Sequence, residues 1–360
     1  MPLLMPLLIF QRPSTQYSLR LLRKMHCMGF SKTFLLWVQF VQIDDRSSEM
    51  VPAHFGVPQG SILGPVLFNL YVADLQGMLD CPCYQYADDT TFYLHSKVSA
   101  LAQCSVELNG VLSRLGDYSE SSNLALNCSK TKWMLISTPQ MARVHNLDVC
   151  SVPVACREIS LERITCTKLL GVQLDQNLKW NEHVKSLLTS CYGTLSILRK
   201  LKNLAPFYVR KNLAESLVIA KLDYASTVFY PLPQYQVDRL QRLQNACAGF
   251  VLRKYAGPED LAYLNWLPIS ERRDFNILKL THKAIHSSDF PEYLSLELRN
   301  VHTHNLRSSE APLLLVPKET GTFQHSAASI FNKLPSALRN IKDYISFCRS
   351  LKKYLSNRVK

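Results

Sequence analysis

The sequence predicts an α+β fold, in which a domain of mixed helices and strands precedes a domain built from helices alone. From residue 51 to about residue 180, helical patterns alternate with short β-prone runs. Beyond residue 181 only long amphipathic helical patterns recur. The 360 residues, 47% hydrophobic and 19% charged, are enough for two domains with buried cores.

The first ten residues, MPLLMPLLIF, are apolar but carry Pro2 and Pro6. They lack a preceding basic residue, and they fall short of the roughly 18–20 apolar residues that a membrane span requires. We therefore expect no targeting or membrane segment here. Residues 15–42 follow as a helical pattern, with a break at Gly29.

A hairpin is predicted next. Residues 51–64 are rich in Pro and Gly and indicate a loop, and 65–79 resume an apolar helical pattern. Residues 84–87 and 90–94 are β-prone runs on either side of Asp88 and Asp89. Since aspartate tolerates turns, we expect both carboxylates at the hairpin tip.

The remaining elements follow in order. Residues 98–122 predict an amphipathic helix, and short strands are expected around 133–137 and 169–174. Among the later helices, 236–253 has the clearest apolar face. We expect a polar linker at 299–325 and a last helical stretch at 327–355.

Charge is distributed unevenly along the chain, whose net charge is +13. Residues 1–43 contain no Asp or Glu, residues 44–160 are net acidic, and residues 161–360 hold 29 basic against 16 acidic side chains. An acidic middle followed by a basic half suggests a metal centre next to a module that holds a polyanion. A basic surface that only maintains solubility is the alternative, and charge alone does not decide between them.

The eleven cysteines form no CxxC pair. This pattern argues against a disulfide framework and against a zinc finger. It favours a reduced intracellular compartment, cytoplasmic or nuclear, and no disulfide partner.

The adjacent carboxylates of Asp88 and Asp89 suit a hard cation such as Mg²⁺, which prefers carboxylate oxygens together with phosphates and water. Nucleotidyl transfer uses two such ions. An Asp-Asp pair by itself is weak evidence, because exposed turns commonly carry one.

Four ordered motifs strengthen the signal. Gly56–Pro65 with the following Leu67–Leu75 resembles motif B of reverse transcriptases of non-LTR (LINE-type) retrotransposons, and Tyr86–Asp89 resembles their motif C. Leu126–Trp133 is similar to motif D, and Leu169–Asp175 to the primer-grip motif E. Segments 222–226, 240–246 and 331–335 resemble later parts of the same family, so the resemblance covers residue 15 to the end.

This resemblance implies an RNA-directed DNA polymerase with a right-hand palm, an antiparallel sheet with helices, followed by an all-helical thumb. The palm would span 51–180, the thumb 181–298, and a linker with a basic helical tail 299–360. Implied partners are an RNA template, a DNA primer or duplex and deoxynucleoside triphosphates, with Mg²⁺ as the cofactor of a two-metal site.

The resemblance also implies residue roles. Asp88 is the principal metal ligand and Asp89 its neighbour. Lys130 matches the residue that protonates pyrophosphate, although a solvated surface lysine is an equal alternative. The residues implied to contact template or nucleotide are Pro58, Gln59, Gly60, Ser61, Tyr86 and Ala87, and those of the primer grip are Leu170, Gly171 and Val172.

The sequence departs from the family in one respect. The family's motif A supplies the first catalytic aspartate, but residues 1–43 contain no acid, and the context of Asp44, Asp45 and Glu49 resembles the hairpin before motif B. We therefore expect residues 1–50 to be a truncated, atypical helical segment without fingers or motif A. A sheet without that strand would have an unpaired edge.

Two functional hypotheses follow from this departure. The first is a polymerase domain that is catalytically defective. The second is a non-catalytic, nucleic-acid-binding remnant of a retrotransposon protein. A group II intron maturase is a remote third, against which segments 222–226 and 331–335 argue.

Overall fold

The computed structural model describes residues 3–11, 18–29, 38–39, 42–43, 46–47, 49, 51–52, 62–299 and 312–358. The chain divides into two compact units, which we call the sheet unit (residues 1–169 and 174–179) and the helical unit (170–173 and 180–360). Helices combined with small sheets agree with the predicted α+β class.

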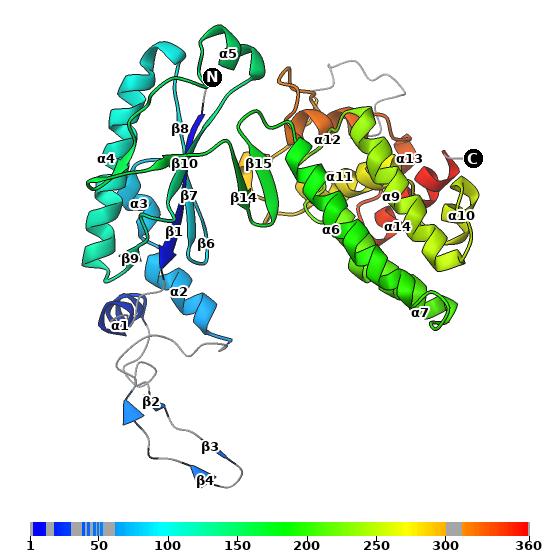
Figure 1. Cartoon of the computed structure of the whole chain (residues 1–360), viewed down its shortest axis with the longest axis horizontal. Helices are drawn as coiled ribbons and strands as arrows, with labels where there is room; N and C mark the ends of the chain where they lie inside the picture. Colours follow the sequence, from blue (N-terminus) through cyan, green and yellow to red (C-terminus); the bar gives the residue numbers. More distant parts are fainter. Residues whose placement is uncertain are drawn as a thin grey trace. The chain divides into compact units, whose positions relative to one another are not determined.

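The sheet unit is built on one main sheet with the strand order β13-β10-β1-β7-β6 (Figure 1). Strand β1 is antiparallel to both of its neighbours, and two short strands, β8 and β9, also pair with it. The strands are β1 (Leu3–Gln11), β6 (Cys83–Tyr86), β7 (Asp89–Phe92), β8 (Leu94–His95), β9 (Ala125–Leu126), β10 (Lys132–Ile136) and β13 (Glu162–Arg163).

Strand β1 overturns one expectation. The sequence predicts a sheet with an unpaired edge, but residues 3–11 lie in the middle of the sheet, where Met5 pairs with Met134 and Leu8 with Thr90. The physical reason is the apolar run itself, since nine extended residues span a sheet and their backbone groups are satisfied by ladders on both sides. Pro6 lacks an N–H donor, and the strand tolerates it opposite Trp133.

Helices and sheet share one hydrophobic core. The predicted helix at 98–122 is confirmed as α4 (Leu101–Ser121), and its Leu108 and Leu112 are completely buried, in the same core as Phe92 and Trp133. The other helices of the unit are α1 (Ser18–Cys27), α2 (Gly64–Val72), α3 (Leu75–Leu79) and α5 (Pro139–Val144), with a 3-10 turn at Val98–Ala100.

Four two-stranded sheets complete the strands. The single strand expected around 169–174 is instead a hairpin of β14 and β15, because two residues with positive φ, Leu170 and Gly171, reverse the chain there. The paired strands are β2 (Val38–Gln39) with β5 (Val51–Pro52), β3 (Gln42–Ile43) with β4 (Arg46–Ser47), β11 (Ala155–Cys156) with β12 (Ile159–Ser160), and β14 (Cys166–Leu169) with β15 (Val172–Asp175).

The helical unit has two hydrophobic clusters, one among α6 to α10 and one among α11 to α14. The helix predicted at 236–253 is confirmed as α9, whose Leu243, Cys247 and Val251 are fully buried. The α-helices of the helical unit are α6 (Asn181–Lys200), α7 (Phe207–Ala214), α8 (Ala220–Asp223), α9 (Gln234–Leu252), α10 (Pro258–Tyr263), α11 (Ile269–His286), α12 (Phe323–Phe331), α13 (Ser336–Arg339) and α14 (Tyr344–Asn357). A π-turn at Glu215–Ile219 joins α7 to α8, and a 3-10 turn lies at Glu292–Leu294.

The last helical stretch, predicted as continuous over 327–355, is three helices. Pro335 caps the short α13, and the Asp343 carboxylate accepts a 2.7 Å hydrogen bond from the backbone N–H of Ser346 at the start of α14. Residues 300–311 of the expected linker at 299–325 lie outside the described residues. Residues 312–322 are described and irregular. In this stretch the helices α13 and α14 therefore begin after Pro335 and after the capping Asp343.

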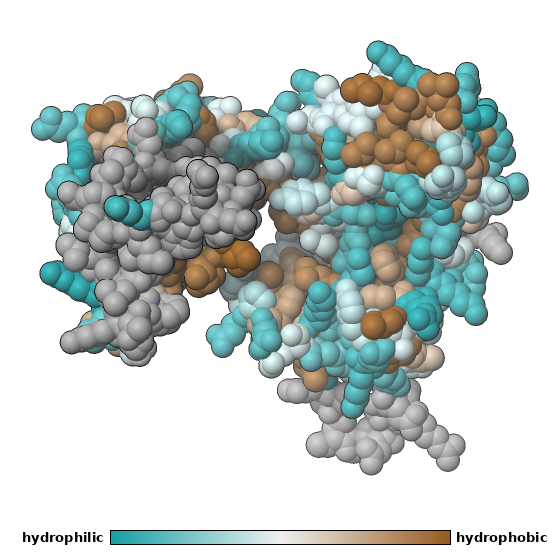
Figure 2. Space-filling model, turned by 90° about the horizontal axis from the view of Figure 1, so that it is seen from below, coloured by the Kyte–Doolittle hydropathy of each residue, from teal (hydrophilic) through white to brown (hydrophobic). Residues whose placement is uncertain are grey.

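Hydrophobic side chains lie among hydrophilic ones on the face seen in Figure 2. Exposed examples in the helical unit include Leu204, Tyr208 and Tyr255. Of the helices that the structure describes, none combines the length and the apolar character needed to cross a membrane.

Candidate active site

The predicted hairpin is confirmed, and it carries the two aspartates at its tip. Strands β6 and β7 pair antiparallel with Tyr86 opposite Asp89, which leaves Ala87 and Asp88 as a two-residue loop. Ala87 has φ +54°, the left-handed region that such tight loops require and that costs a residue with a Cβ atom energy. Tyr86 is 67% exposed, while Asp88 and Asp89 are half-buried.

The strand behind the tip is firmly held. Thr90 and Phe92 of β7 are completely buried, and Phe92 is part of the core shared with α4. The ring of Tyr84 on the outer strand β6 stacks on that of Tyr93, which follows β7, with centroids 5.9 Å apart. The buried strand β7 therefore begins directly at the carboxylates, and a packed strand is a support that holds a charged pair in place.

Burial, followed by the neighbouring Asp88 carboxylate, raises the pKa of Asp89. Like charges on adjacent residues disfavour the ionised form, and a bound cation removes that penalty. The electrostatics of the hairpin tip therefore favour occupation by a positive ion.

Strand β1 lies directly beside this hairpin. Its backbone register places Ile9 opposite Asp89 and Leu8 opposite Thr90. The strand's sequence, LLMPLLIFQ, contains no carboxylate. The strand position opposite Asp89 is thus filled by isoleucine, whose side chain has no oxygen, nitrogen or sulfur atom to bind a metal ion.

The carboxylates of Asp88 and Asp89 are the candidate ligands of a divalent cation. Two carboxylate side chains suit one Mg²⁺ ion that also takes phosphate and water oxygens. Among the residues that the structure describes, no group of three or more His, Cys, Asp or Glu side chains gathers at one place. Within the described part of the chain, the carboxylates of Asp88 and Asp89 therefore fit one ion and are too few for two. Asp44 and Asp45 lie outside the described residues.

Lys130 lies on the opposite side of β1 from the hairpin in the order of the sheet. It follows β9, which pairs with Phe10 and Gln11 of β1, and its backbone N–H donates a 3.1 Å hydrogen bond to the side chain of Asn127. The Lys130 side chain is exposed. The structure thus places Lys130 in a loop that follows β9 of the same sheet, where its backbone contacts Asn127.

The tip of the β14–β15 hairpin belongs to the helical unit. The Tyr224 hydroxyl donates a 2.6 Å hydrogen bond to the Leu170 carbonyl. Gly171 has φ +87°, and a Cβ atom there would lie 3.1 Å from the Tyr224 ring. Position 171 therefore requires glycine, both for its backbone conformation and for the close approach of the Tyr224 ring. The next residue, Val172, is buried.

The four motif B residues Pro58, Gln59, Gly60 and Ser61 lie outside the described residues. Described structure resumes at Ile62, and α2 begins at Gly64 with Pro65 in its first turn. Sequence reasoning missed the strand at residues 3–11, for which a nine-residue apolar run was the available signal. It also missed a polar pocket in the helical unit, whose signal is the pair Lys279 and Lys283 at helical i, i+4 spacing.

Comparison with known proteins agrees with the motifs. Residues 19–174 match the family model of reverse transcriptase (RNA-dependent DNA polymerase). The chain is 31% identical over 185 residues to a probable RNA-directed DNA polymerase from transposon BS of Drosophila melanogaster, covering 49% of this chain and 19% of that protein. It is 25% identical over 282 residues to the RNA-directed DNA polymerase from mobile element jockey of the same organism, covering 74% and 28%.

A third relative, a probable RNA-directed DNA polymerase from the Drosophila melanogaster transposon X-element, is 24% identical over 209 residues, covering 54% of this chain and 21% of that protein. The chain thus spans between 19% and 28% of the length of these relatives. Strand β1 precedes the residues that match the family model. The family match and the three relatives together show that this chain carries a reverse transcriptase domain of the non-LTR (LINE-type) retrotransposon kind.

Proposed function

We propose that the sheet unit is the palm and the helical unit the thumb of an RNA-directed DNA polymerase whose metal site is incomplete. The observation that carries this proposal is strand β1, which fills the sheet beside Asp89 without a carboxylate. The substrates would be an RNA template, a DNA primer and deoxynucleoside triphosphates, and Mg²⁺ would be held by Asp88 and Asp89.

The catalytic defect follows from the chemistry of the site. Two ions a few ångströms apart need more carboxylate oxygen than two adjacent aspartates supply. Residues that act as one constellation contribute non-additively, so that removing one member abolishes most of the rate. The polymerase activity of this chain should therefore be very low.

The other roles in this proposal follow from position. Lys130, exposed in a loop of the same sheet, would meet pyrophosphate. Tyr86 and Ala87 at the hairpin tip and Pro58 to Ser61 before α2 would contact template and nucleotide. The hairpin tip at Leu170 to Val172, anchored on Tyr224, would support the primer end.

Primer extension by the purified chain tests the proposal. An RNA template annealed to a DNA primer would be incubated with Mg²⁺ and deoxynucleoside triphosphates, with Asp88→Ala as the matched variant. We expect no extension above that of Asp88→Ala. Robust extension that is lost in Asp88→Ala would show that the site is complete.

A second candidate function is nucleic-acid binding without chemistry. It is supported by the excess of 29 basic over 16 acidic side chains in residues 161–360. Binding through phosphates is salt-dependent and needs no metal. Duplex binding that is unchanged by Asp88→Ala and by Mg²⁺ would favour this function, whereas binding that requires Mg²⁺ and Asp88 would argue against it.

A further inference from the structure

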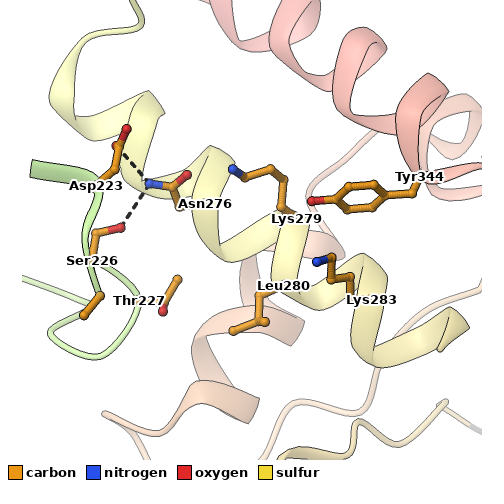
Figure 3. Close-up of a pocket in the computed structure, with 9 residues that line it drawn as sticks. Asp223, Ser226, Thr227, Asn276, Lys279, Leu280, Lys283 and Tyr344 are labelled. Atoms are coloured by element: carbon orange, nitrogen blue, oxygen red, sulfur yellow. Dashed lines mark hydrogen bonds between the residues drawn. The ribbon is translucent and has the colours of Figure 1, made fainter. Parts of the chain in front are cut away.

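The helical unit contains a polar pocket that is separate from the hairpin of Asp88 and Asp89. Its volume is about 220 Å³, and it lies between the loop that follows α8 and helix α11 (Figure 3). Ser226 and Thr227 lie on the loop side, Lys279 and Lys283 on α11, and Tyr344 at the start of α14. We call this group of five residues the lysine pocket.

The two lysines give the pocket its charge. They are one helical turn apart on α11, and Figure 3 shows their side chains on the pocket side of that helix. The Lys279 ammonium lies 4.9 Å from the centroid of the Phe275 ring, and the Lys283 ammonium 5.1 Å from that of Tyr344. Within the described part of the chain neither ammonium forms an ion pair, so both positive charges are available to a ligand.

One carboxylate, Asp223, also lines the pocket, but it is already neutralised. The Arg272 guanidinium donates two hydrogen bonds of 2.6 Å to its two oxygens. The Asn276 amide donates a third, of 3.2 Å, to the same carboxylate, and another of 3.0 Å to the Ser226 hydroxyl (Figure 3). Asp223 is therefore committed to Arg272 and Asn276, and the pocket retains a net positive charge.

The pocket offers mainly donors. Ammonium groups donate and never accept, and the hydroxyls of Thr227 and Tyr344 can donate as well. Burial raises the pKa of Tyr344, so its hydroxyl keeps its proton at neutral pH. In Figure 3 this hydroxyl points toward Lys279. Such a set matches an anion with several acceptor oxygens, for which charge-assisted hydrogen bonds are strongest.

We propose that the lysine pocket binds a phosphate group of a nucleic-acid backbone and so fixes one strand against α11. The inference rests on the proposed function, because it supplies a defined contact for the nucleic acid that the thumb would hold. A free phosphate or nucleotide shares the same chemistry, and the experiment separates the two sources. Lysine is the residue that binds phosphate as a point charge and without sequence preference.

The test measures binding of an RNA–DNA hybrid duplex to the full chain by fluorescence anisotropy over a range of salt concentrations. The test variant is Lys279→Gln with Lys283→Gln. The matched control is Lys318→Gln with Lys333→Gln, which removes the same charge from exposed positions of the same unit outside the pocket. Circular dichroism verifies that both variants keep their helices.

We expect the test variant to bind roughly tenfold more weakly at low salt, with a salt slope reduced by about 1–2, because each phosphate contact contributes about one released counterion. The control should change both quantities much less. Replacing both lysines by arginine should keep the affinity within about threefold, since the charge is retained. Lys283→Gln alone, at an exposed position, should give about half the change in salt slope. This single variant tests the inference even if the double variant misfolds.

Three results would overturn the inference, and they are distinguishable. If wild type binds no duplex, the proposed function itself fails. If wild type binds but test and control variants weaken equally, the pocket has no special role. If inorganic phosphate or a deoxynucleoside triphosphate binds wild type and loses affinity in the test variant while duplex binding is unchanged, the pocket takes free phosphate instead of a backbone.

Discussion

Hairpin β6–β7 and strand β1 lie side by side in one sheet, yet they differ in what they contribute. The hairpin supplies both geometry and chemistry, since its tight loop carries Asp88 and its second strand begins with Asp89. Strand β1 supplies geometry alone, since it pairs with β7 and β10 through nine residues that include no acid. Backbone pairing completes a sheet whatever side chain stands opposite Asp89.

The pairing of a sheet and the placement of oxygen atoms that could bind a metal ion are therefore separate structural requirements. Backbone pairing is available to almost any extended segment, whereas an ion requires particular oxygen atoms at particular positions. A complete sheet is therefore weak evidence for a complete active site.

Removing residues 1–11 should have the largest effect. The deletion takes away a central strand and leaves unpaired edges on both β7 and β10, so we expect the sheet unit to lose stability by about 4 kcal/mol or more and to aggregate. Thermal unfolding and size-exclusion chromatography measure this. Gln11→Ala, at the end of the strand, is the control. Unchanged unfolding of the deletion variant would show that β1 does not hold the sheet together.

Ile9→Asp should add a metal-binding carboxylate to β1. It places a carboxylate at the register position opposite Asp89, and we expect Mn²⁺ affinity to rise roughly tenfold, which corresponds to about 1.4 kcal/mol. Isothermal titration calorimetry measures the affinity. Leu8→Asp adds the same charge opposite the buried Thr90 and should destabilise the sheet without a gain in affinity. Equal Mn²⁺ affinities of wild type and Ile9→Asp would show that position 9 of β1 does not lie at the metal site.

Ala87→Gly should relieve conformational strain in the loop of the β6–β7 hairpin. Relief of the left-handed conformation at φ +54° outweighs the entropy that glycine loses on folding, so we expect stabilisation by about 0.5 kcal/mol. Urea unfolding measures it. Ala246→Gly, inside helix α9, is the control and should destabilise by about 1 kcal/mol. Destabilisation of both variants would mean that the loop is not strained.

Asp88→Asn should have the smallest effect, which is a lower pKa of Asp89, because one of the two causes of its elevation is removed. The raised pKa means that the folded chain binds this proton more tightly than the unfolded chain, so Asp89 lowers stability as pH rises above the ordinary value of 3.8. The variant should weaken that pH dependence. NMR titration of the carboxyl carbon measures the pKa, and Asp117→Asn on α4 should leave it unchanged.

Local patterns predicted the elements whose information is local. The hairpin around Asp88, helix α4 and helix α9 follow from periodicity and turn chemistry within each segment. The β14–β15 hairpin was missed as a hairpin although Gly171 marks its turn. The breaks before α13 and α14 carry Pro335 and Asp343, which a stricter application of capping rules would have found.

Features that depend on distant partners were not accessible to the sequence. Strand β1 pairs with residues that follow it by some 80 to 130 positions, and its prolines argue locally against a central strand. The lysine pocket joins Thr227, Lys279 and Tyr344 from three separate segments. In the candidate site, motifs identified Asp88 and Asp89, but only the sheet register identified Ile9 as their neighbour.

The number of metal ions bound per chain distinguishes an incomplete carboxylate set at the hairpin tip from a complete one. Electron paramagnetic resonance of Mn²⁺ titrated into the purified chain, with Asp88→Asn and Asp89→Asn combined as the control, counts ions without requiring activity. We expect a single, weakly bound ion in the wild type that disappears in the control. Two tightly bound ions in the wild type, both lost in the control, would contradict this expectation and would show that the carboxylate set is complete.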